Sequence, residues 1–307
     1  MSPFKGITLK LCSVILFVVM SSLIKAASDA VPPGQAVFFR SLFAIPVILT
    51  WLAVRGDLRT GLRVTSPMGH FWRGFVGTAA MGLMFAGLGL LPLPEVTALG
   101  YTAPLLTVVF AAMFLDERVG LFRIGAVALG LVGVLIVLAP RLSTLTGETV
   151  QTTQAVGAVM VLMGATCAAL AQIYIRKLVA TEQTSAIVFY FSATSTLLSL
   201  LTIPFGWTIP GGTETVYLIL AGLIGGIAQI FLTSAYRFAD ASVIAPFDYA
   251  SMLFAIVIGY FIFDEVPTVQ MLAGAALIVL AGIVIILREH HLGLQRGKSK
   301  AIKTPQG

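Results

Sequence analysis

Charged residues are scarce in this sequence. Of its 307 residues, 10% are charged and 58% are hydrophobic, and the mean hydropathy is +1.00. Ordinary soluble domains carry about 25% charged residues. So little charge excludes a soluble enzyme, a disordered chain and, despite the calculated pI of 9.5, a nucleic-acid-binding domain. The composition predicts a protein embedded in a lipid bilayer.

Residues that build metal and catalytic sites are also few. The two cysteines, Cys12 and Cys167, lie in different apolar stretches and predict no disulfide framework. The three histidines lie near polar ends, and the sequence has no HExxH motif, no Cys/His cluster and no phosphate-binding lysine loop. We therefore expect no metal, no cofactor and no enzymatic activity, with a membrane-embedded enzyme as an alternative.

Apolar runs long enough to span a membrane, about 20 residues each, fill most of the chain. They are continuous rather than alternating, which favours helices over a β-barrel. The sequence predicts an all-α membrane protein with ten transmembrane helices, at about 6–26, 34–54, 70–91, 95–115, 119–139, 154–178, 184–204, 213–236, 241–263 and 268–287.

Basic residues predict the orientation of these helices. If the N-terminus is cytoplasmic, all but three of the 19 Lys and Arg residues lie on the cytoplasmic side; the exceptions are Lys25, Arg40 and Arg141. Such a bias fits one orientation under the positive-inside rule. With an even number of spans, we expect a multi-pass protein of the bacterial inner membrane with both termini cytoplasmic.

The two halves of the sequence resemble each other. A shift of about 148 residues superposes small and aromatic positions and two Asp-Glu pairs. These positions are Gly74 with Gly222, Gly77 with Gly225, Tyr101 with Tyr249, and Asp116-Glu117 with Asp264-Glu265. The pattern predicts a first repeat at 6–139, a second repeat at 154–288 and a basic cytoplasmic tail at 289–307.

Five spans in each repeat place the second copy in the membrane in the opposite direction. Two inverted five-helix repeats are typical of secondary transporters, in which the substrate binds near the bilayer midplane where the repeats meet. Exchange of conformations between two related halves converts an inward-open state into an outward-open state. The repeats therefore predict a carrier that works by alternating access.

Polar residues inside the apolar runs are the candidates for substrate binding, because an ionisable group there costs at least about 2.5–3.5 kcal/mol. Asp248 is interpreted either as a proton-coupling or substrate-binding acid or as half of a structural pair with an Arg or Tyr. Arg40 is interpreted as a ligand for an anionic substrate group or as a partner of Asp29 or Glu95. The complete set of candidates is Lys25, Arg40, Tyr101, Thr102, Gln172, Gln229, Thr233, Tyr236, Asp248 and Tyr249.

The two Asp-Glu pairs end equivalent helices. Carboxylates are unfavourable at a helix C-terminus and favourable at an N-terminus. We expect them to cap the helices that follow, the fifth and tenth spans, with a gating role as the alternative.

Several segments carry a resemblance to a known family. They are 91–98 (LPLPEVTA), 103–106 (APLL) and 114–117 (FLDE), answered in the second half by 238–245 (FADASVIA) and 263–265 (FDE). With ten spans and a five-plus-five duplication, the chain resembles EamA-type members of the drug/metabolite transporter superfamily over nearly its whole length.

Within that superfamily, 31–41 (VPPGQAVFFRS) and 69–74 (GHFWRG) look like segments of bacterial riboflavin transporters. This resemblance implies a small-molecule substrate, with riboflavin uptake as the first hypothesis. Export of amino acids or other metabolites and uptake of S-adenosylmethionine are the alternatives within the family, and a passive channel is an alternative outside it. We expect contact with the lipid bilayer and no nucleic-acid partner, and the oligomeric state stays open.

Overall fold

The computed structural model describes residues 3–58, 60–114, 121–142, 149–179, 181–238 and 245–302. Every regular element in these ranges is helical. The first half contains α1 (Pro3–Ala27), α2 (Pro33–Val54), α3 (Pro67–Leu90), α4 (Leu93–Gly100), α5 (Thr102–Phe114) and α6 (Leu121–Leu142). The second half contains α7 (Thr149–Val179), α8 (Thr184–Leu200), η1 (Ile203–Phe205), α9 (Gly212–Phe238), η2 (Ala245–Tyr249), α11 (Ala250–Phe263) and α12 (Val269–Ile302).

The ten predicted spans correspond to these helices, with two of the spans interrupted. Five helices in the described ranges are long and apolar enough to cross a membrane, and four more apolar segments are shorter. The fourth span is divided into α4 and α5, and the described part of the ninth consists of η2 followed by α11. The tenth helix continues to Ile302, beyond its predicted end at 287.

Proline explains both interruptions. Pro104, in the first turn of α5, has no N–H to donate to the carbonyl of Gly100, so the helix breaks at Tyr101. Pro246 lies in the 3-10 segment η2, directly before α11. Proline in the first turn also marks the starts of α2, α3 and α4, where a missing N–H has no cost.

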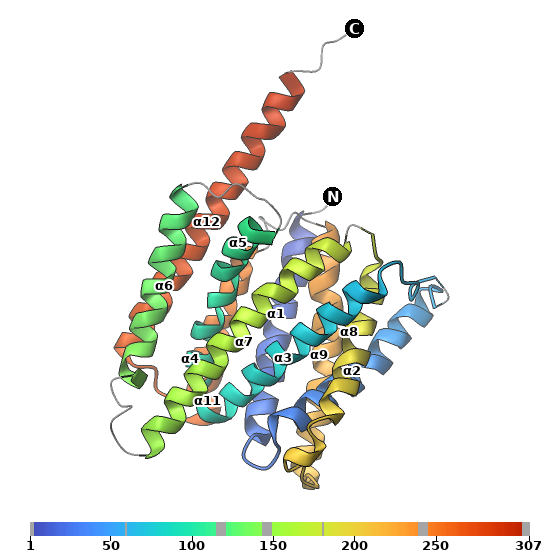
Figure 1. Cartoon of the computed structure of the whole chain (residues 1–307), viewed down its shortest axis with the longest axis vertical. Coiled ribbons are helices and arrows are strands. Elements are labelled where there is room, and N and C mark those ends of the chain that lie inside the picture. Colours follow the sequence, from blue (N-terminus) through green and yellow to red (C-terminus); the bar gives the residue numbers. More distant parts are fainter. Residues whose placement is uncertain are drawn as a thin grey trace.

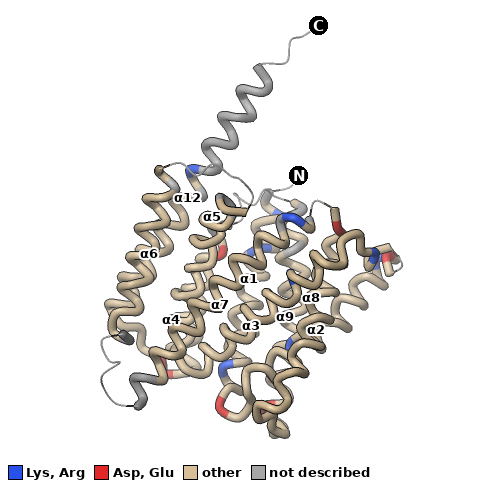
Figure 2. Tube along the Cα trace, in the orientation of Figure 1, with Lys and Arg blue, Asp and Glu red and all other residues tan. Residues whose placement is uncertain are grey.

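The two halves run through the bundle in opposite directions. We call the end at which α1 begins the terminal face, and the other end the opposite face. Figure 1 shows α1 leaving the terminal face and α7, its counterpart, running toward it. Charged positions lie mainly near the two ends of the bundle (Figure 2). The fold is therefore an all-α bundle of two inverted five-helix repeats.

The helix contacts repeat when the halves are exchanged. α1 packs against α9 as α7 packs against α3, and α2 packs against α9 as α8 packs against α3. α2 also packs against α8, and α6 against α12, so each of these pairs joins equivalent helices of the two repeats. The interface between the repeats therefore runs through the centre of the molecule.

Candidate functional site

A cavity of about 270 Å³ lies between α1, α3, α4 and α11. Its wall is mostly apolar, and hydroxyl groups are contributed by Ser21, Thr97, Tyr101 and Ser251. A second cavity of about 260 Å³ lies between the end of α1, the start of α2, the end of α3 and α7. Phe85 lines both cavities.

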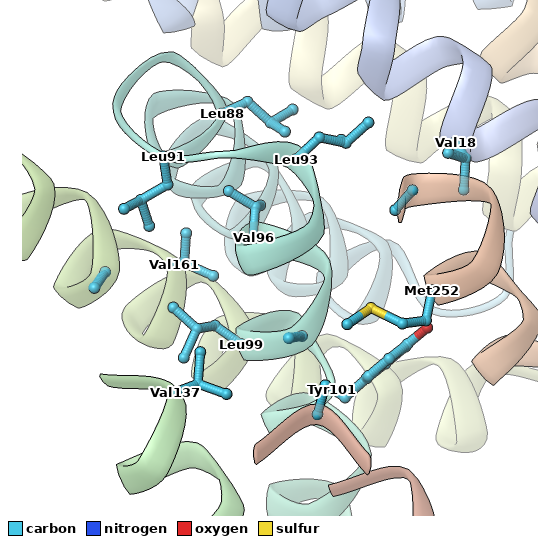
Figure 3. Packing of buried hydrophobic residues seen from close by; sticks show 14 of the residues in the cluster. Val18, Leu88, Leu91, Leu93, Val96, Leu99, Tyr101, Val137, Val161 and Met252 are labelled. Carbon is cyan, nitrogen blue, oxygen red and sulfur yellow. The ribbon is translucent and has the colours of Figure 1, made fainter. Parts of the chain in front are cut away.

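Tyr101 connects the two repeats at the first cavity. It occupies the break between α4 and α5, and its hydroxyl lies 2.5 Å from Ser251 Oγ. Its ring meets the ring of Tyr249, its repeat equivalent, edge to face at a centroid distance of 5.0 Å. Figure 3 shows Tyr101 beside Met252, next to a packed group of apolar side chains that includes Val96 and Leu99. The break in the fourth span thus places an aromatic ring and a hydroxyl group where the repeats meet.

An ion pair joins α1 to η2 on the side of the terminal face. Lys10 Nζ lies 2.7 Å from Asp248 Oδ1, and the lysine side chain is 2% exposed while that of Asp248 is 44% exposed. The carboxylate of Asp248 is therefore paired with Lys10 rather than with the Arg or Tyr of the structural interpretation, and its role in proton coupling or substrate binding stays a prediction.

A second ion pair joins the other end of α1 to the loop that follows α11. Lys25 Nζ lies 2.9 Å from Glu265 Oε1 and donates hydrogen bonds to the carbonyls of Leu88 (3.1 Å) and Leu91 (2.7 Å). Glu265 Oε2 accepts a hydrogen bond of 2.8 Å from the backbone N–H of Leu93. Lys25 thereby neutralises the C-terminus of α3, and Glu265 caps the N-terminus of α4.

The predicted capping by the Asp-Glu pairs is wrong for Glu265. Its carboxylate caps α4 of the first repeat rather than the following helix α12, because Asp264 adopts a left-handed conformation (φ 53°) that ends α11 and redirects the chain. The equivalent pair, Asp116-Glu117, lies outside the described residues.

Two buried arginines share one aromatic ring between α2, α3 and α8. The guanidinium carbon of Arg73 lies 4.0 Å from the centroid of Phe191, and that of Arg40 lies 5.7 Å from it. Arg40 is 3% exposed and Arg73 is 7% exposed. No ion pair within 4 Å joins either of them to an acidic residue in the described part of the chain, including Asp29 and Glu95.

This arrangement is energetically unfavourable as it stands. An ionised side chain at the centre of a membrane helix costs at least about 2.5–3.5 kcal/mol. Arg40 and Arg73 stand seven and six residues after the first residues of α2 and α3, and both are buried. A desolvated cation–π contact returns about 2 kcal/mol. Nε of Arg40, and Nε and Nη1 of Arg73, are buried without a hydrogen-bond partner among the described residues. Phe191 therefore does not compensate for two buried cations.

On the terminal face, Glu182 joins the loop before α8 to the loop before α3. Its Oε1 accepts hydrogen bonds from the backbone N–H groups of Thr65 (2.7 Å) and Ser66 (2.6 Å), and its Oε2 lies 3.6 Å from His70 Nε2. Burial raises the pKa of the Glu182 carboxyl, but the two backbone hydrogen bonds and His70 outweigh burial and leave that pKa below its ordinary value.

Comparison with known proteins identifies the family. The profile of the EamA-like transporter family matches twice, at residues 4–139 and 147–288. The chain belongs to the EamA-like transporter family. Membership makes this protein a membrane transporter, and the double match fits the internal repeat.

Characterised relatives cover most of the chain. The pseudopaline exporter CntI of Pseudomonas aeruginosa is 31% identical over 91% of this chain and 95% of its own. The S-adenosylmethionine uptake transporter of Rickettsia felis is 27% identical over 83% of each chain. The riboflavin transporter of Rhizobium johnstonii is 28% identical over 85% of this chain and 83% of its own.

The fold is also found in solved structures. One crystal structure superposes with a TM-score of 0.66 at 21% sequence identity, over 92% of this chain and 97% of the other. At that identity the likeness concerns the fold alone.

The sequence-predicted candidates of this EamA-like transporter do not form one cluster. Tyr101 lines the first cavity, whereas Lys25 and Asp248 form the ion pairs beyond its two ends, and Arg40 lies beside Arg73. The other candidates are Thr102 and Tyr249, which are buried, Gln229, which is half-buried on α9, and Gln172, which is exposed on α7. The side chains of Thr233 and Tyr236 lie outside the described ones.

Sequence reasoning missed Lys10, Arg73 and Ser251. Lys10 and Arg73 were counted among the basic residues that set the orientation, yet both are buried. Their positions inside apolar helices, seven residues after the first residue of α1 and six after that of α3, are the signal that could have found them. Ser251 carries no such signal, because a serine is unremarkable in a membrane helix.

Proposed function

We propose that this protein is a carrier of the bacterial inner membrane that moves a small polar organic metabolite by alternating access. Membership in a transporter family supports the general role. The observation that carries the mechanism is the position of the first cavity between two ion pairs, each joining α1 to the span that contains η2 and α11 or to the loop that follows it.

The geometry of α1 suits two gates. Lys10 and Lys25 are separated by about 22 Å along the helix at a rise of 1.5 Å per residue. Phe17, Val18 and Ser21, which line the cavity, lie between the two lysines. A carrier must open one end of such a path while the other stays closed. We propose that the Lys10–Asp248 pair closes the terminal face and that the Lys25–Glu265 pair closes the opposite face.

The sidedness of the gates follows from the distribution of basic residues. The spans predicted from the sequence assign all but three of the 19 Lys and Arg residues to the side of the N-terminus, which supports cytoplasmic termini under the positive-inside rule. Lys10–Asp248 is then the cytoplasmic gate and Lys25–Glu265 the external gate. The second cavity, beyond Phe85, lies toward the external end of this path.

Three substrate hypotheses are supported by specific observations. Riboflavin uptake is supported by the 28% identical riboflavin transporter and by the Tyr101 ring and hydroxyl groups at the cavity, which can stack on a flat ring and hydrogen-bond a polar chain. Export of an amino-acid-like or other metabolite is supported by the 31% identical exporter. Uptake of S-adenosylmethionine is the third candidate, from the 27% identical relative.

Counterflow in proteoliposomes tests the proposal. The purified full-length protein is reconstituted into vesicles preloaded with unlabelled riboflavin, S-adenosylmethionine or amino acids, and entry of the labelled compound is followed. A carrier gives transient, saturable accumulation that depends on the preloaded solute. Linear, non-saturable entry indicates a channel, and a labelled product of changed mass indicates an enzyme; either result contradicts the proposal.

A further inference from the structure

The arginine pair described above has the properties of an incomplete binding site. Arg40 and Arg73 are at least nine-tenths buried, and their guanidinium carbons lie 5.7 and 4.0 Å from the centroid of the Phe191 ring, so they are at most about 10 Å apart. We infer that these two arginines bind an anionic group, a carboxylate or a phosphate, of the transported molecule. The inference rests on the carrier function proposed above and specifies its substrate class.

Both guanidinium groups have buried N–H donors without a hydrogen-bond acceptor among the described residues. These donors are Nε of Arg40 and Nε and Nη1 of Arg73. Arginine presents a planar set of N–H donors that matches a carboxylate or phosphate with two parallel hydrogen bonds. A bound carboxylate or phosphate would accept hydrogen bonds from donors of this kind and offset part of the buried positive charge.

Glycines make room for both guanidinium groups. A Cβ on Gly77 would collide with Nη1 of Arg73, and a Cβ on Gly225 would lie 3.3 Å from Nε of Arg40. Gly77 and Gly225 are equivalent positions of the two repeats, one on α3 and the other on α9. Each repeat therefore contributes a side-chain-free position against which one arginine lies.

The pair also lies where the repeats meet. Arg40 and Phe191 each stand seven residues after the first residue of their helices, Pro33 of α2 and Thr184 of α8, so they occupy equivalent positions. These two helices pack against each other across the interface between the repeats. In carriers with inverted repeats, such an interface holds the substrate.

The substrate hypotheses differ in their need for this site. An amino-acid-like metabolite carries a carboxylate, whereas riboflavin is uncharged and would leave both guanidinium groups unpaired. The arginine pair therefore favours a substrate with a carboxylate or phosphate.

Ligand-dependent melting of the purified full-length protein tests the inference. The probes are glutarate against its uncharged diamide, and glycerol 3-phosphate against glycerol, at matched ionic strength, so the two arms separate carboxylate from phosphate. We expect at least one anion to raise the melting temperature more than its neutral counterpart. Arg40→Gln and Arg73→Gln are expected to weaken the apparent affinity at least ten-fold, and Arg55→Gln, which removes an exposed arginine, to leave it unchanged.

The variants also report on the unoccupied site. Without an anion, each Arg→Gln variant is expected to melt at or above the temperature of the wild type, because it removes an uncompensated buried charge. If either variant fails to fold, Arg40→Lys and Arg73→Lys keep the charge but lose the paired donors, and weaker anion binding is still expected.

Three outcomes would overturn the inference. In the first, the anion raises the melting temperature of the wild type no more than its neutral counterpart does. In the second, the anion stabilises the Arg→Gln or Arg→Lys variants as much as it stabilises the wild type. In the third, the Arg→Gln variants melt below the wild type without the anion and still respond to it. Binding in detergent requires no transport. A protein that binds the anions but fails in counterflow therefore contradicts the carrier function alone, and a carrier without anion-specific binding contradicts the inference alone.

Discussion

At the scale of single residues, a few buried polar side chains are placed where ordinary membrane packing does not need them. Tyr101, at the break in the fourth span, contacts Ser251, and Lys25 donates hydrogen bonds to two backbone carbonyls and pairs with the carboxylate of Glu265. Each of these groups joins segments from different repeats. Contacts of this kind are the ones that a change of conformation between the repeats must break or form.

The hydroxyl pair Tyr101–Ser251 gives a first prediction. Tyr101→Phe and Ser251→Ala are each expected to lower the free energy of unfolding by at least about 0.5–1.5 kcal/mol, because each removes the hydrogen bond between the two hydroxyl groups. Ser251→Ala also removes the hydrogen bond of 2.7 Å that Ser251 donates to the carbonyl of Asp248. The double variant is expected to lose less than the sum of the two, because both substitutions remove the same bond. Thermal or denaturant unfolding in detergent measures these values.

Tyr260→Phe is the control, because Tyr260 is 51% exposed. It is expected to leave stability unchanged. Strictly additive losses in the double variant would contradict the hydrogen bond between Tyr101 and Ser251.

Glu182 gives a prediction about pH. Its pKa is lowered in the folded protein, so its hydrogen bonds stabilise the fold fully above the ordinary glutamate pKa of about 4.3. The stabilisation is lost as the pH falls below that value through the pKa of the folded state. The melting temperature of the wild type is therefore expected to fall more steeply below pH 4.5 than that of Glu182→Gln. Asp57→Asn, at an exposed position, is expected to follow the wild type, and identical pH profiles for Glu182→Gln and the wild type would refute this role.

The sequence predicted which polar residues lie inside the helices better than it predicted which partners they contact. An ionisable residue in an apolar run is visible in the sequence, which is why Lys25, Arg40 and Asp248 were identified. Their partners were not predictable, because Lys10 and Asp248, and Lys25 and Glu265, are about 240 residues apart and meet only when the repeats are packed together. Arg73 was not identified as a site residue, because a basic residue near a helix end is also expected from the positive-inside rule.

At the scale of helices, close packing at small residues holds the repeats together. Gly74 on α3 lies against Thr194 of α8, and its equivalent Gly222 on α9 lies against Phe39 and Phe43 of α2. Small residues let helix backbones approach closely where lipid gives no hydrophobic drive. The sequence predicted the helices well because apolar runs mark them, but it did not predict the break at Tyr101, which depends on Pro104 inside an otherwise continuous run.

The contact between α6 and α12 gives a prediction at this scale. A Cβ on Gly133 would lie 2.8 Å from the carbonyl oxygen of Gly274, so the two backbones would have to separate. Gly133→Ala is expected to lower stability by about 1–3 kcal/mol. Gly125→Ala on the same helix has no atom within 4 Å of the new Cβ and is expected to be neutral or to stabilise by up to about 1 kcal/mol. Equal effects of the two substitutions would contradict the close approach of α6 and α12.

At the scale of the whole molecule, the inverted repeats and the two ion pairs belong to the same proposed mechanism. The duplication was predictable from the sequence, because aligned glycines, tyrosines and Asp-Glu pairs survive in both halves. The path between the halves was not, because it depends on which faces of the helices meet. In the structure, one helix, α1, carries a lysine at each end of the cavity, and both carboxylate partners belong to the ninth span and its following loop.

Alternating access through these two gates is the central claim, and the side from which the cavity can be reached tests it most directly. A single reporter cysteine, Ser21→Cys, is placed in the cavity after Cys12 and Cys167 are replaced by serine. Lys10→Glu or Lys25→Glu is then added, so that repulsion from Asp248 or Glu265 opens one gate. A membrane-impermeant thiol reagent is applied to right-side-out and inverted vesicles. We predict labelling from the cytoplasmic side in the Lys10→Glu protein and from the external side in the Lys25→Glu protein, whereas labelling from the same side in both would contradict the two-gate mechanism.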